Sequence, residues 1–158
     1  MSRFTSFMDQ ALEQAQKAAR RGEVPVGAVV VSPTGRVIAA AGNQTRADND
    51  PSAHAEMLAI RAACKAMKSQ RLTGCDLYVT LEPCAMCAAV IANARIKRLY
   101  YGAADPKSGG VAHGARVFVH PQCHHKPEVY DGICDAKAAD LLTEFFAAQR
   151  KGVDNGEK

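Results

Sequence analysis

Apolar residues along the chain recur at two spacings, one typical of helices and one typical of buried strands. Met8, Leu12, Ala15 and Ala19 form a helical stripe that Gly22 can end, and similar stripes run through residues 53–67 and 138–145. Apolar or β-branched runs predict strands at 24–31, 36–43, 76–82 and 96–103, the first of them covered on both faces. A short helix at 83–95 and a last short strand at 128–132 complete the predicted elements.

Turn and capping residues predict how these elements connect. The residues "SPTG" at 32–35 join the first two strands as a hairpin. Asp50 or Ser52 is the expected N-cap of the helix that follows, with Pro51 in its first turn, and Pro83 is expected to open the next helix. Strands separated by helices of this length imply parallel pairing through right-handed crossovers. We therefore predict an α/β fold with helices on both faces of one sheet.

Length and composition are ordinary for a globular protein. The 158 residues fit one domain, residues 1–158, with a tail from about residue 152 that is expected to fray. Hydrophobic residues make up 47% and charged residues 23%, and no apolar run approaches the ~18 residues of a membrane span. The first 22 residues are typical of an amphipathic helix and not of a secretory signal. We expect a cytoplasmic protein with no membrane partner.

The net charge of +4 is unevenly distributed. Between residues 95 and 126 a single acid, Asp105, stands among six basic residues: Arg95, Lys97, Arg98, Lys107, Arg116 and Lys126. This segment is either a docking surface for a polyanion or a solvated loop face that keeps the protein soluble, and the sequence leaves both open.

The six cysteines favour free thiols or a metal over disulfides, because we expect a reducing compartment. Three of them, Cys64, Cys75 and Cys134, are interpreted as small core residues. Cys123 adjoins His124 and His125, but adjacent ligands without a distant partner are weak evidence for a metal. We expect the two histidines to line the substrate channel or the contact between subunits.

Cys84 and Cys87 are compatible with a redox couple, with half of a zinc site, or with two core residues. At positions i and i+3 of a helix that opens at Pro83, both sulfurs can reach one ion. The positive end of the helix dipole lowers thiol pKa values there and favours thiolates. Zinc needs at least one more protein ligand.

His54 is the strongest candidate for the third ligand. It opens a helix after a strand and its loop, as Cys84 does, and helix N-termini of this kind gather at the carboxyl edge of a parallel sheet. Glu56 follows two residues later. Because residues i and i+2 of an ideal helix point about 200° apart, His54 and Glu56 share a site only if that site lies off the helix end.

Glu56 has the chemistry of a catalytic acid and base. Zinc held by two thiolates and an imidazole lowers the pKa of a coordinated water from about 15.7 toward 7. A carboxylate beside that water can take its proton and pass it to a ring nitrogen and then to a leaving amine, which is hydrolytic deamination. The residues His54-Ala55-Glu56 and Pro83-Cys84-Ala85-Met86-Cys87 match the H-x-E and P-C-x-x-C signature of zinc deaminases.

The resemblance extends over nearly the whole chain. The stretches "EVPVGAVVV", "DPSAHAEMLAIR", "LYVTLEPCAMCA", "ARIKRLYYGAADPKSG" and "LLTEFFAAQR", with the pair Gly42-Asn43, resemble the bacterial tRNA-specific adenosine deaminases. The resemblance implies conversion of the wobble adenosine in a tRNA anticodon stem-loop to inosine. It also implies a homodimer with one Zn²⁺ per subunit and a three-layer α/β/α fold, like that of cytidine deaminase, around a five-stranded mixed sheet.

The same resemblance assigns substrate contacts by position. Asn43 is expected to hydrogen-bond the target base, Val26 to pack against it, the Ala55 backbone to orient it, and Glu82 and Pro83 to shape the pocket wall. Asp105, Lys107, Phe146 and Arg150 are expected to contact the flanking anticodon loop. From the residues alone, Val26 reads as a core position and Asn43 as a turn residue.

Two departures from the family pattern and two alternative functions remain. The segment "GVAHGARVFVHPQCHHKP" after "DPKSG" differs from the common pattern, and Ser52 stands where threonine is more usual. A deaminase of free guanine, cytosine or cytidine would share the zinc motifs without needing a basic face. A zinc-stabilised or redox module would use Cys84 and Cys87 with no chemistry at Glu56.

Apolar residues of the helix at 87–95 are expected to meet a second copy of the chain.

Overall fold

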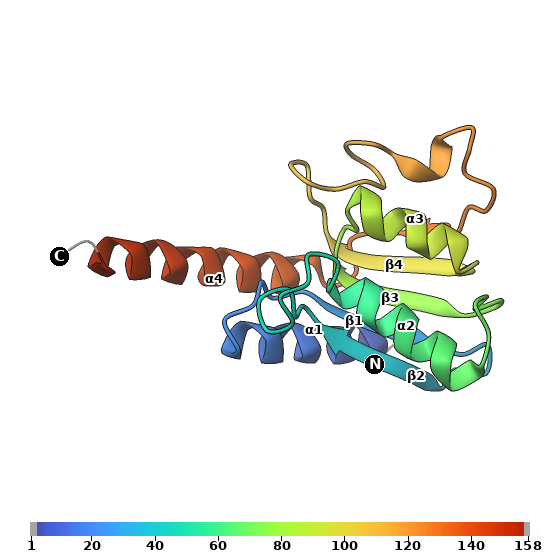
Figure 1. Cartoon of the computed structure of the whole chain (residues 1–158), viewed down its shortest axis with the longest axis horizontal. Coiled ribbons are helices and arrows are strands. Elements are labelled where there is room, and N and C mark those ends of the chain that lie inside the picture. Colours follow the sequence, from blue (N-terminus) through green and yellow to red (C-terminus); the bar gives the residue numbers. More distant parts are fainter. Residues whose placement is uncertain (1–2, 157–158) are drawn as a thin grey trace.

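The computed structural model describes residues 3–156 and contains four α-helices, one 3₁₀ helix and five strands in that range (Figure 1). In chain order these are α1 Arg3–Arg20, β1 Gly27–Val31, β2 Val37–Gly42, α2 Ala55–Met67, β3 Asp76–Leu81, α3 Ala85–Asn93, β4 Arg98–Ala103, η1 Val117–Val119, β5 Glu128–Tyr130 and α4 Asp135–Gly156. The predicted helices and strands are therefore all present, with shorter bounds for most of the strands.

The five strands form one mixed sheet in the order β2-β1-β3-β4-β5. β1 pairs antiparallel with both β2 and β3, whereas β3, β4 and β5 pair in parallel. The expected hairpin is confirmed, and so is parallel pairing where α3 connects β3 to β4. The strand that follows α2 lies beside β1 and not beside β2, so the connection from β2 to β3 through α2 crosses β1.

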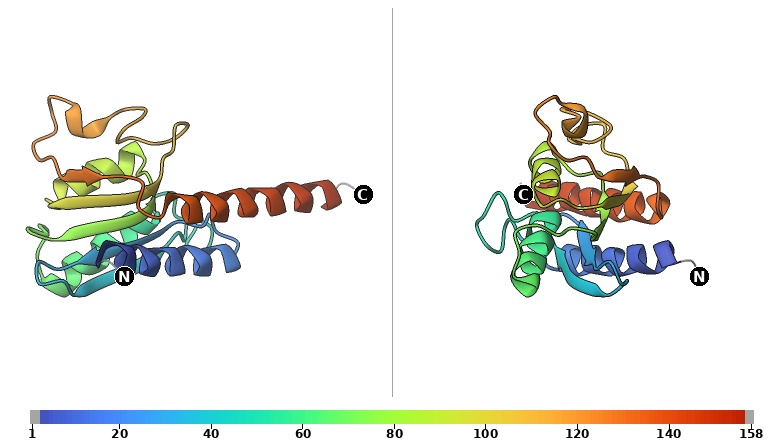
Figure 2. Two further views of the ribbon diagram at one scale, coloured as in Figure 1. Left: turned by 180° about the vertical axis from the view of Figure 1, so that it is seen from behind. Right: turned by 90° about the vertical axis from the view of Figure 1, so that its right-hand side faces the viewer.

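Helices cover both faces of the sheet, which confirms the three-layer architecture (Figure 2). On one face, α2 and α3 pack with Val30, Val79 and Leu99 in the larger core cluster. On the other face, α1 and the start of α4 pack with Val29 and Tyr78 in the second cluster. The alternation of Val29 and Val30 between the two clusters shows that β1 is buried on both sides, as its unbroken apolar sequence predicts.

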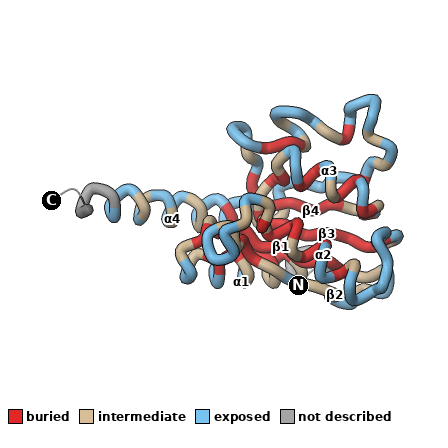
Figure 3. Tube along the Cα trace, in the orientation of Figure 1, coloured by how far each residue is buried: buried red, intermediate tan, exposed pale blue. Residues whose placement is uncertain are grey.

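Among the strands, burial is concentrated in β1, β3 and β4, while α4 extends beyond the body of the molecule (Figures 1 and 3). Its first turns pack on β4 and α1, where Ala138 is buried, and its later residues alternate between exposed and half-buried. α4 is helical to Gly156, which is further than residue 152, the point from which we expected fraying.

Two expected helix starts are wrong. The N-cap of α2 is His54, not Asp50 or Ser52, because the Asp50 carboxylate accepts hydrogen bonds from the backbone and hydroxyl of Ser52 and holds "DPS" in a local turn. The N-cap of α3 is Cys84, so Pro83 lies outside the helix; its carbonyl accepts a hydrogen bond from the Gly110 N–H.

All six cysteines are free, as predicted. Within residues 3–156, none of the helices combines the length and the apolar character needed to cross a bilayer.

Candidate active site

Two helix N-caps supply the metal-ligand candidates. His54 and Cys84 have extended backbone angles (φ −75°, ψ 153° and φ −69°, ψ 173°), and neither side chain caps its own helix. Both side chains are therefore directed away from the helices that they precede. Cys87 lies in the first turn of α3 and is fully buried. The arrangement brings an imidazole and two thiols together at one end of the sheet.

The three donor atoms have the spacing that zinc requires. His54 Nδ1 lies 3.6 Å from Cys84 Sγ and 3.4 Å from Cys87 Sγ, and all three atoms lie within 4.8 Å of one another. Zn–S bonds of about 2.3 Å and Zn–N bonds of about 2.0 Å at a tetrahedral angle separate sulfur from nitrogen by about 3.5 Å. The residues present thus fit one zinc ion with a fourth position open. A redox couple would not need an imidazole equally close to both sulfurs.

Hydrogen bonding already favours a thiolate at this position. The hydrogen bond from the Cys87 thiol, followed by the one with His54, lowers the pKa of Cys84 to about 4. Cys87 holds the shared proton, and this hydrogen bond together with burial raises the pKa of Cys87. The interaction with Cys84 also raises the pKa of His54. Cys84 is therefore the thiolate of the cluster before any metal binds, which is the form of sulfur that ligates zinc.

Glu56 lies beside these donors in the second position of α2. Its side chain is buried, and burial raises the pKa of Glu56 above its ordinary value. His54 and Glu56 would point about 200° apart if both were helical residues. His54 is instead the N-cap, so its side chain does not follow the helical repeat and both side chains can face one site. Glu56, His54 and Cys84 line the same cavity of about 240 Å³.

Four of the residues assigned by resemblance line that cavity. Val26, Asn43, Glu82 and Asp105 surround it together with Val24, Thr45, Leu81 and Ser108, which sequence reasoning missed. The side-chain oxygen of Asn43 accepts a hydrogen bond of 2.8 Å from the Ala55 N–H. Ala55 and Pro83 are buried behind the wall and do not line it. The missed residues are single positions in separate segments of the chain, so no motif or periodic pattern in the sequence marks them.

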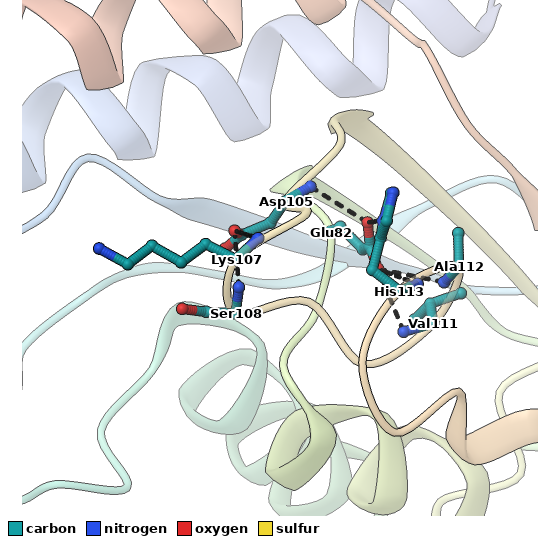
Figure 4. Close-up of polar contacts among 7 residues, drawn as sticks. All are labelled: Glu82, Asp105, Lys107, Ser108, Val111, Ala112 and His113. Carbon is teal, nitrogen blue, oxygen red and sulfur yellow. Dashed lines mark hydrogen bonds and ion pairs between the residues drawn. The ribbon is translucent and has the colours of Figure 1, made fainter.

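Glu82 organises the loop on one side of the cavity (Figure 4). Its buried carboxylate accepts hydrogen bonds from the backbone N–H groups of Asp105, Val111, Ala112 and His113, and lies 2.7 Å from His113 Nδ1. Burial opposes ionisation, but the Asp105 N–H and the other hydrogen bonds outweigh it and lower the pKa of Glu82. Asp105 then accepts from the N–H groups of Lys107 and Ser108.

Glu23 plays the same part on the opposite side, and no motif in the sequence singles it out. It is buried and accepts hydrogen bonds from the backbone of Arg46 and Ala47 and from the Thr45 hydroxyl. Two buried carboxylates thus shape the two loops that bound the cavity.

A second cavity of about 600 Å³ adjoins the first. It is lined by Asp105, Lys107, Phe146 and Arg150, the four residues expected to meet the flanking anticodon loop, and it shares Val24, Leu81, Asp105 and Ser108 with the cavity beside Glu56. Phe146 is exposed, whereas Phe145 is half-buried and packs edge-on against it. The structure therefore brings together residues that lie about forty positions apart in the sequence.

The group formed by Cys123, His124 and His125 does not converge as a metal site does. His125 Nε2 lies 2.7 Å from the Ile96 carbonyl, and the Cys123 thiol donates to the His125 carbonyl. Cys123 and His124 line an apolar cavity against α3. Among residues 3–156, the His54, Cys84 and Cys87 cluster is the group of three or more His, Cys, Asp or Glu side chains with metal-binding spacing.

Comparison with known proteins agrees with this geometry. Residues 1–103 match the model of the cytidine and deoxycytidylate deaminase zinc-binding region. The match contains both ligand segments and Glu56. The chain belongs to this family of zinc-dependent hydrolytic deaminases, and zinc is its cofactor.

Within that family it belongs with the tRNA-specific adenosine deaminases. It is 55% identical over 150 residues to the tRNA-specific adenosine deaminase of Agrobacterium fabrum, a match that covers 95% of this chain and 98% of the relative. A solved structure from a study of A-to-I editing by tRNA:A34 deaminases matches with a TM-score of 0.86 at 57% identity, over 87% of this chain and 99% of that one. The guanine deaminase of Nitrosomonas europaea shares the fold, with a TM-score of 0.79 at 22% identity over 90% and 84% of the two chains.

Proposed function

We propose that this chain converts the wobble adenosine of a tRNA anticodon loop to inosine, with release of ammonia. The observation that carries the proposal is the convergence of His54, Cys84 and Cys87 beside the cavity that is lined by the buried carboxylate of Glu56. The relatives that are called tRNA-specific adenosine deaminases, and the solved structure associated with tRNA:A34 deaminases, support RNA as the substrate.

His54 Nδ1 and the sulfurs of Cys84 and Cys87 would hold the zinc ion. When bound, the ion acts as a Lewis acid that activates a water molecule near neutral pH. Glu56 takes a proton from the water and delivers it to the ring nitrogen beside C6 as the new C–O bond forms at C6. Glu56 then takes the remaining proton from the new hydroxyl group on C6 and delivers it to the exocyclic nitrogen, so that the C–N bond breaks, a carbonyl forms at C6, and ammonia leaves.

The remaining cavity residues position the base. Asn43 directs its oxygen to the Ala55 N–H, which leaves its amide N–H groups to donate to the adenine ring. Val26 supplies an apolar wall, and Glu82 with Pro83 holds the loop that carries Asp105. A base flipped out of a loop fits such an enclosed cavity, because unstacking costs less in a loop than in a duplex.

The second cavity would receive the neighbouring nucleotides. Lys107 and Arg150 can neutralise phosphates, and the exposed ring of Phe146 can stack on an unpaired base. Because this cavity adjoins the one beside Glu56, nucleotides on either side of the target can occupy both at once.

We also propose that the protein is a cytoplasmic homodimer. The exposed face of α3 presents Ala85, Met86, Ala89 and Asn93 beside an apolar cavity of about 230 Å³. A second copy packed on this face would cover small and apolar side chains. Light scattering at micromolar concentration tests the dimer, and a monodisperse monomer would exclude it.

The substitution Glu56→Gln tests the chemistry. It keeps the shape of the side chain but removes its ability to carry a proton, so we expect a full complement of zinc by metal analysis and loss of inosine formation by at least ~100-fold. Unchanged inosine formation would show that Glu56 carries no proton in the reaction, and the absence of inosine formation in the wild type as well would leave a zinc-stabilised or redox module.

The substrate is tested with three compounds. We expect inosine in an anticodon stem-loop that bears a wobble adenosine, and no ammonia from free guanine or cytidine. Ammonia from guanine without inosine in the RNA would replace the proposal with a free-base deaminase.

A further inference from the structure

A second basic surface lies at the edge of the sheet opposite the active site. Arg71, Arg95, Lys97 and Lys126 line a cavity of about 610 Å³ together with His125 and Glu128; we call it the basic cavity. Lys97 immediately precedes β4, and Glu128 begins β5. Glu82 and Asp105 of the active site follow the other ends of β3 and β4. With about 3.3 Å per residue, six-residue strands place the two edges roughly 20 Å apart.

The basic cavity contains most of the excess charge of the molecule. Its four basic residues face one acid, a surplus of three positive charges in a chain whose net charge is +4. Within residues 3–156, none of the four forms an ion pair. The nearby acid Asp76 is already bound by Arg98 at 2.9 Å. A basic surface left without counter-charges in this way is complementary to a polyanion.

Arg95 adds an independent observation. It follows the C-cap of α3 with φ at +62°, a left-handed conformation that glycine adopts without strain. Lys68 ends α2 in the same left-handed region (φ 52°), so this backbone conformation ends the helix at Arg95. Its Nη1 donates to the Ala92 carbonyl, which fixes the side chain at the mouth of the cavity.

The lining residues are suited to phosphates and not to bases. Apart from the His125 imidazole, which lies 2.7 Å from the Ile96 carbonyl through Nε2, the cavity has no aromatic ring on which a base could stack. The basic residues that the sequence grouped between 95 and 126 are divided by the fold. Lys107 lines the cavity beside the active site, while Arg95, Lys97 and Lys126 join Arg71 at the far edge.

We propose that the basic cavity binds backbone phosphates of the substrate tRNA outside its anticodon stem-loop. This rests on the proposed function for the identity of the RNA. The contacts are to phosphates, so they raise affinity without reading sequence. The active site holds the anticodon loop, and the basic cavity holds a part of the same molecule that an isolated stem-loop lacks.

The triple variant Arg71→Gln, Lys97→Gln, Lys126→Gln tests this surface. These side chains are exposed, and within residues 3–156 none of them forms an ion pair. With full-length tRNA we expect KM to rise about tenfold with kcat unchanged. The slope of log K against log salt should fall by about 2 to 3, because each lost phosphate contact removes about 0.7–0.9. With the isolated stem-loop we expect wild-type kcat and KM, which also shows that the variant is folded.

A matched control removes the same charge elsewhere. Lys17→Gln, Arg36→Gln and Lys65→Gln change three exposed residues that lie outside both cavities, and should leave KM for tRNA within twofold of wild type. Wild-type KM and salt slope in the test variant would overturn the proposal, as would an equal rise in KM for tRNA and stem-loop. If wild-type protein binds labelled tRNA in a salt-dependent way but deaminates no RNA, the proposed function alone fails.

Discussion

The amide oxygen of Asn43 accepts a hydrogen bond of 2.8 Å from the backbone N–H of Ala55, the first helical residue of α2. Ala55 stands between His54 and Glu56, so Asn43 holds the segment that carries both a metal ligand and the carboxylate that we propose to be catalytic. The amide oxygen makes this contact, and the amide N–H groups take no part in it. We propose that this one side chain joins the architecture of the site to recognition of the base.

Two substitutions at Asn43 separate these roles. Asn43→Asp keeps the acceptor at the helix N-terminus, where a negative charge is favourable, but removes the amide donors. We expect it to retain stability within about 1 kcal/mol and to lower kcat/KM for the stem-loop by about 10-fold or more. Asn43→Ala leaves the buried Ala55 N–H without a partner and should lower the free energy of unfolding by about 1–3 kcal/mol.

Urea unfolding and single-substrate kinetics on both variants check this prediction. Equal stability losses for Asp and Ala would show that the hydrogen bond to Ala55 contributes nothing to the fold.

Removal of zinc is expected to destabilise the protein. The three donors converge only in the folded chain, so metal binding free energy adds to folding free energy. We expect a chelator to lower Tm, and added zinc to restore it, in wild type and in Glu56→Gln. His54→Ala should have a lower Tm than wild type and respond much less to chelator. Differential scanning calorimetry with metal analysis makes the comparison, and a Tm of wild type that ignores chelator would contradict it.

Glu82 should make stability depend on pH in the acid range. Because hydrogen bonds lower the pKa of Glu82 in the folded state below its ordinary value of 4.5, its ionised form stabilises the protein above that pH. The contribution is lost as pH falls below 4.5 and through the folded pKa. We expect Glu82→Gln to be about 1–3 kcal/mol less stable at pH 7, because four backbone N–H donors lose a charged acceptor.

The difference between wild type and Glu82→Gln should shrink as the pH falls below 4.5. Urea unfolding at several pH values measures it. A constant difference across that range would show that the charge of Glu82 is not the stabilising feature. Glu23 is a second buried carboxylate, and it accepts a hydrogen bond from the backbone N–H of Arg46 in the other loop. The stability of Glu23→Gln therefore provides a comparison with that of Glu82→Gln.

Gly27 is expected to tolerate no side chain. A Cβ at this position would overlap the Ala11 carbonyl and lie 2.6 Å from the Ala15 nitrogen, both in the α1 backbone, which cannot give way as a flexible side chain can. Gly27→Ala should therefore lower the free energy of unfolding by about 1–3 kcal/mol or more. Gly152→Ala, with open space around the position, should be neutral or stabilise by up to about 1 kcal/mol. Thermal unfolding compares the two, and equal Tm values would contradict the close packing of α1 on β1.

Much of the fold follows from local sequence. The apolar runs of β1 and β3 and the helical stripes of α1 and α2 specify elements that the structure confirms, because each pattern must bury its apolar side. The predicted starts of α2 and α3 are wrong. A residue such as Asp50 suits either an N-cap or a local turn, and its hydrogen bonds with Ser52 in the folded chain decide in favour of the turn.

The candidate site divides in the same way. His54, Glu56, Cys84 and Cys87 stand out because their chemistry is unusual at such short spacing. Glu23, Thr45 and Ser108 do not, because their roles depend on loops that meet in space and leave no periodic trace in the chain. The sequence also does not predict that Lys107 lies at one edge of the sheet and Arg95, Lys97 and Lys126 at the other. These residues are close in sequence, and only the direction of the strands between them decides at which edge each one lies.

By itself the sequence determined the type of chemistry: two thiols, an imidazole and a carboxylate at the beginnings of two helices, in a chain with enough apolar pattern to fold around them. Tertiary structure alone decided that His54 Nδ1 lies within 3.4–3.6 Å of both sulfurs, and that the sheet separates one basic surface from another. Residue type and spacing are properties of the chain, whereas convergence depends on which strands are neighbours and in which direction they run.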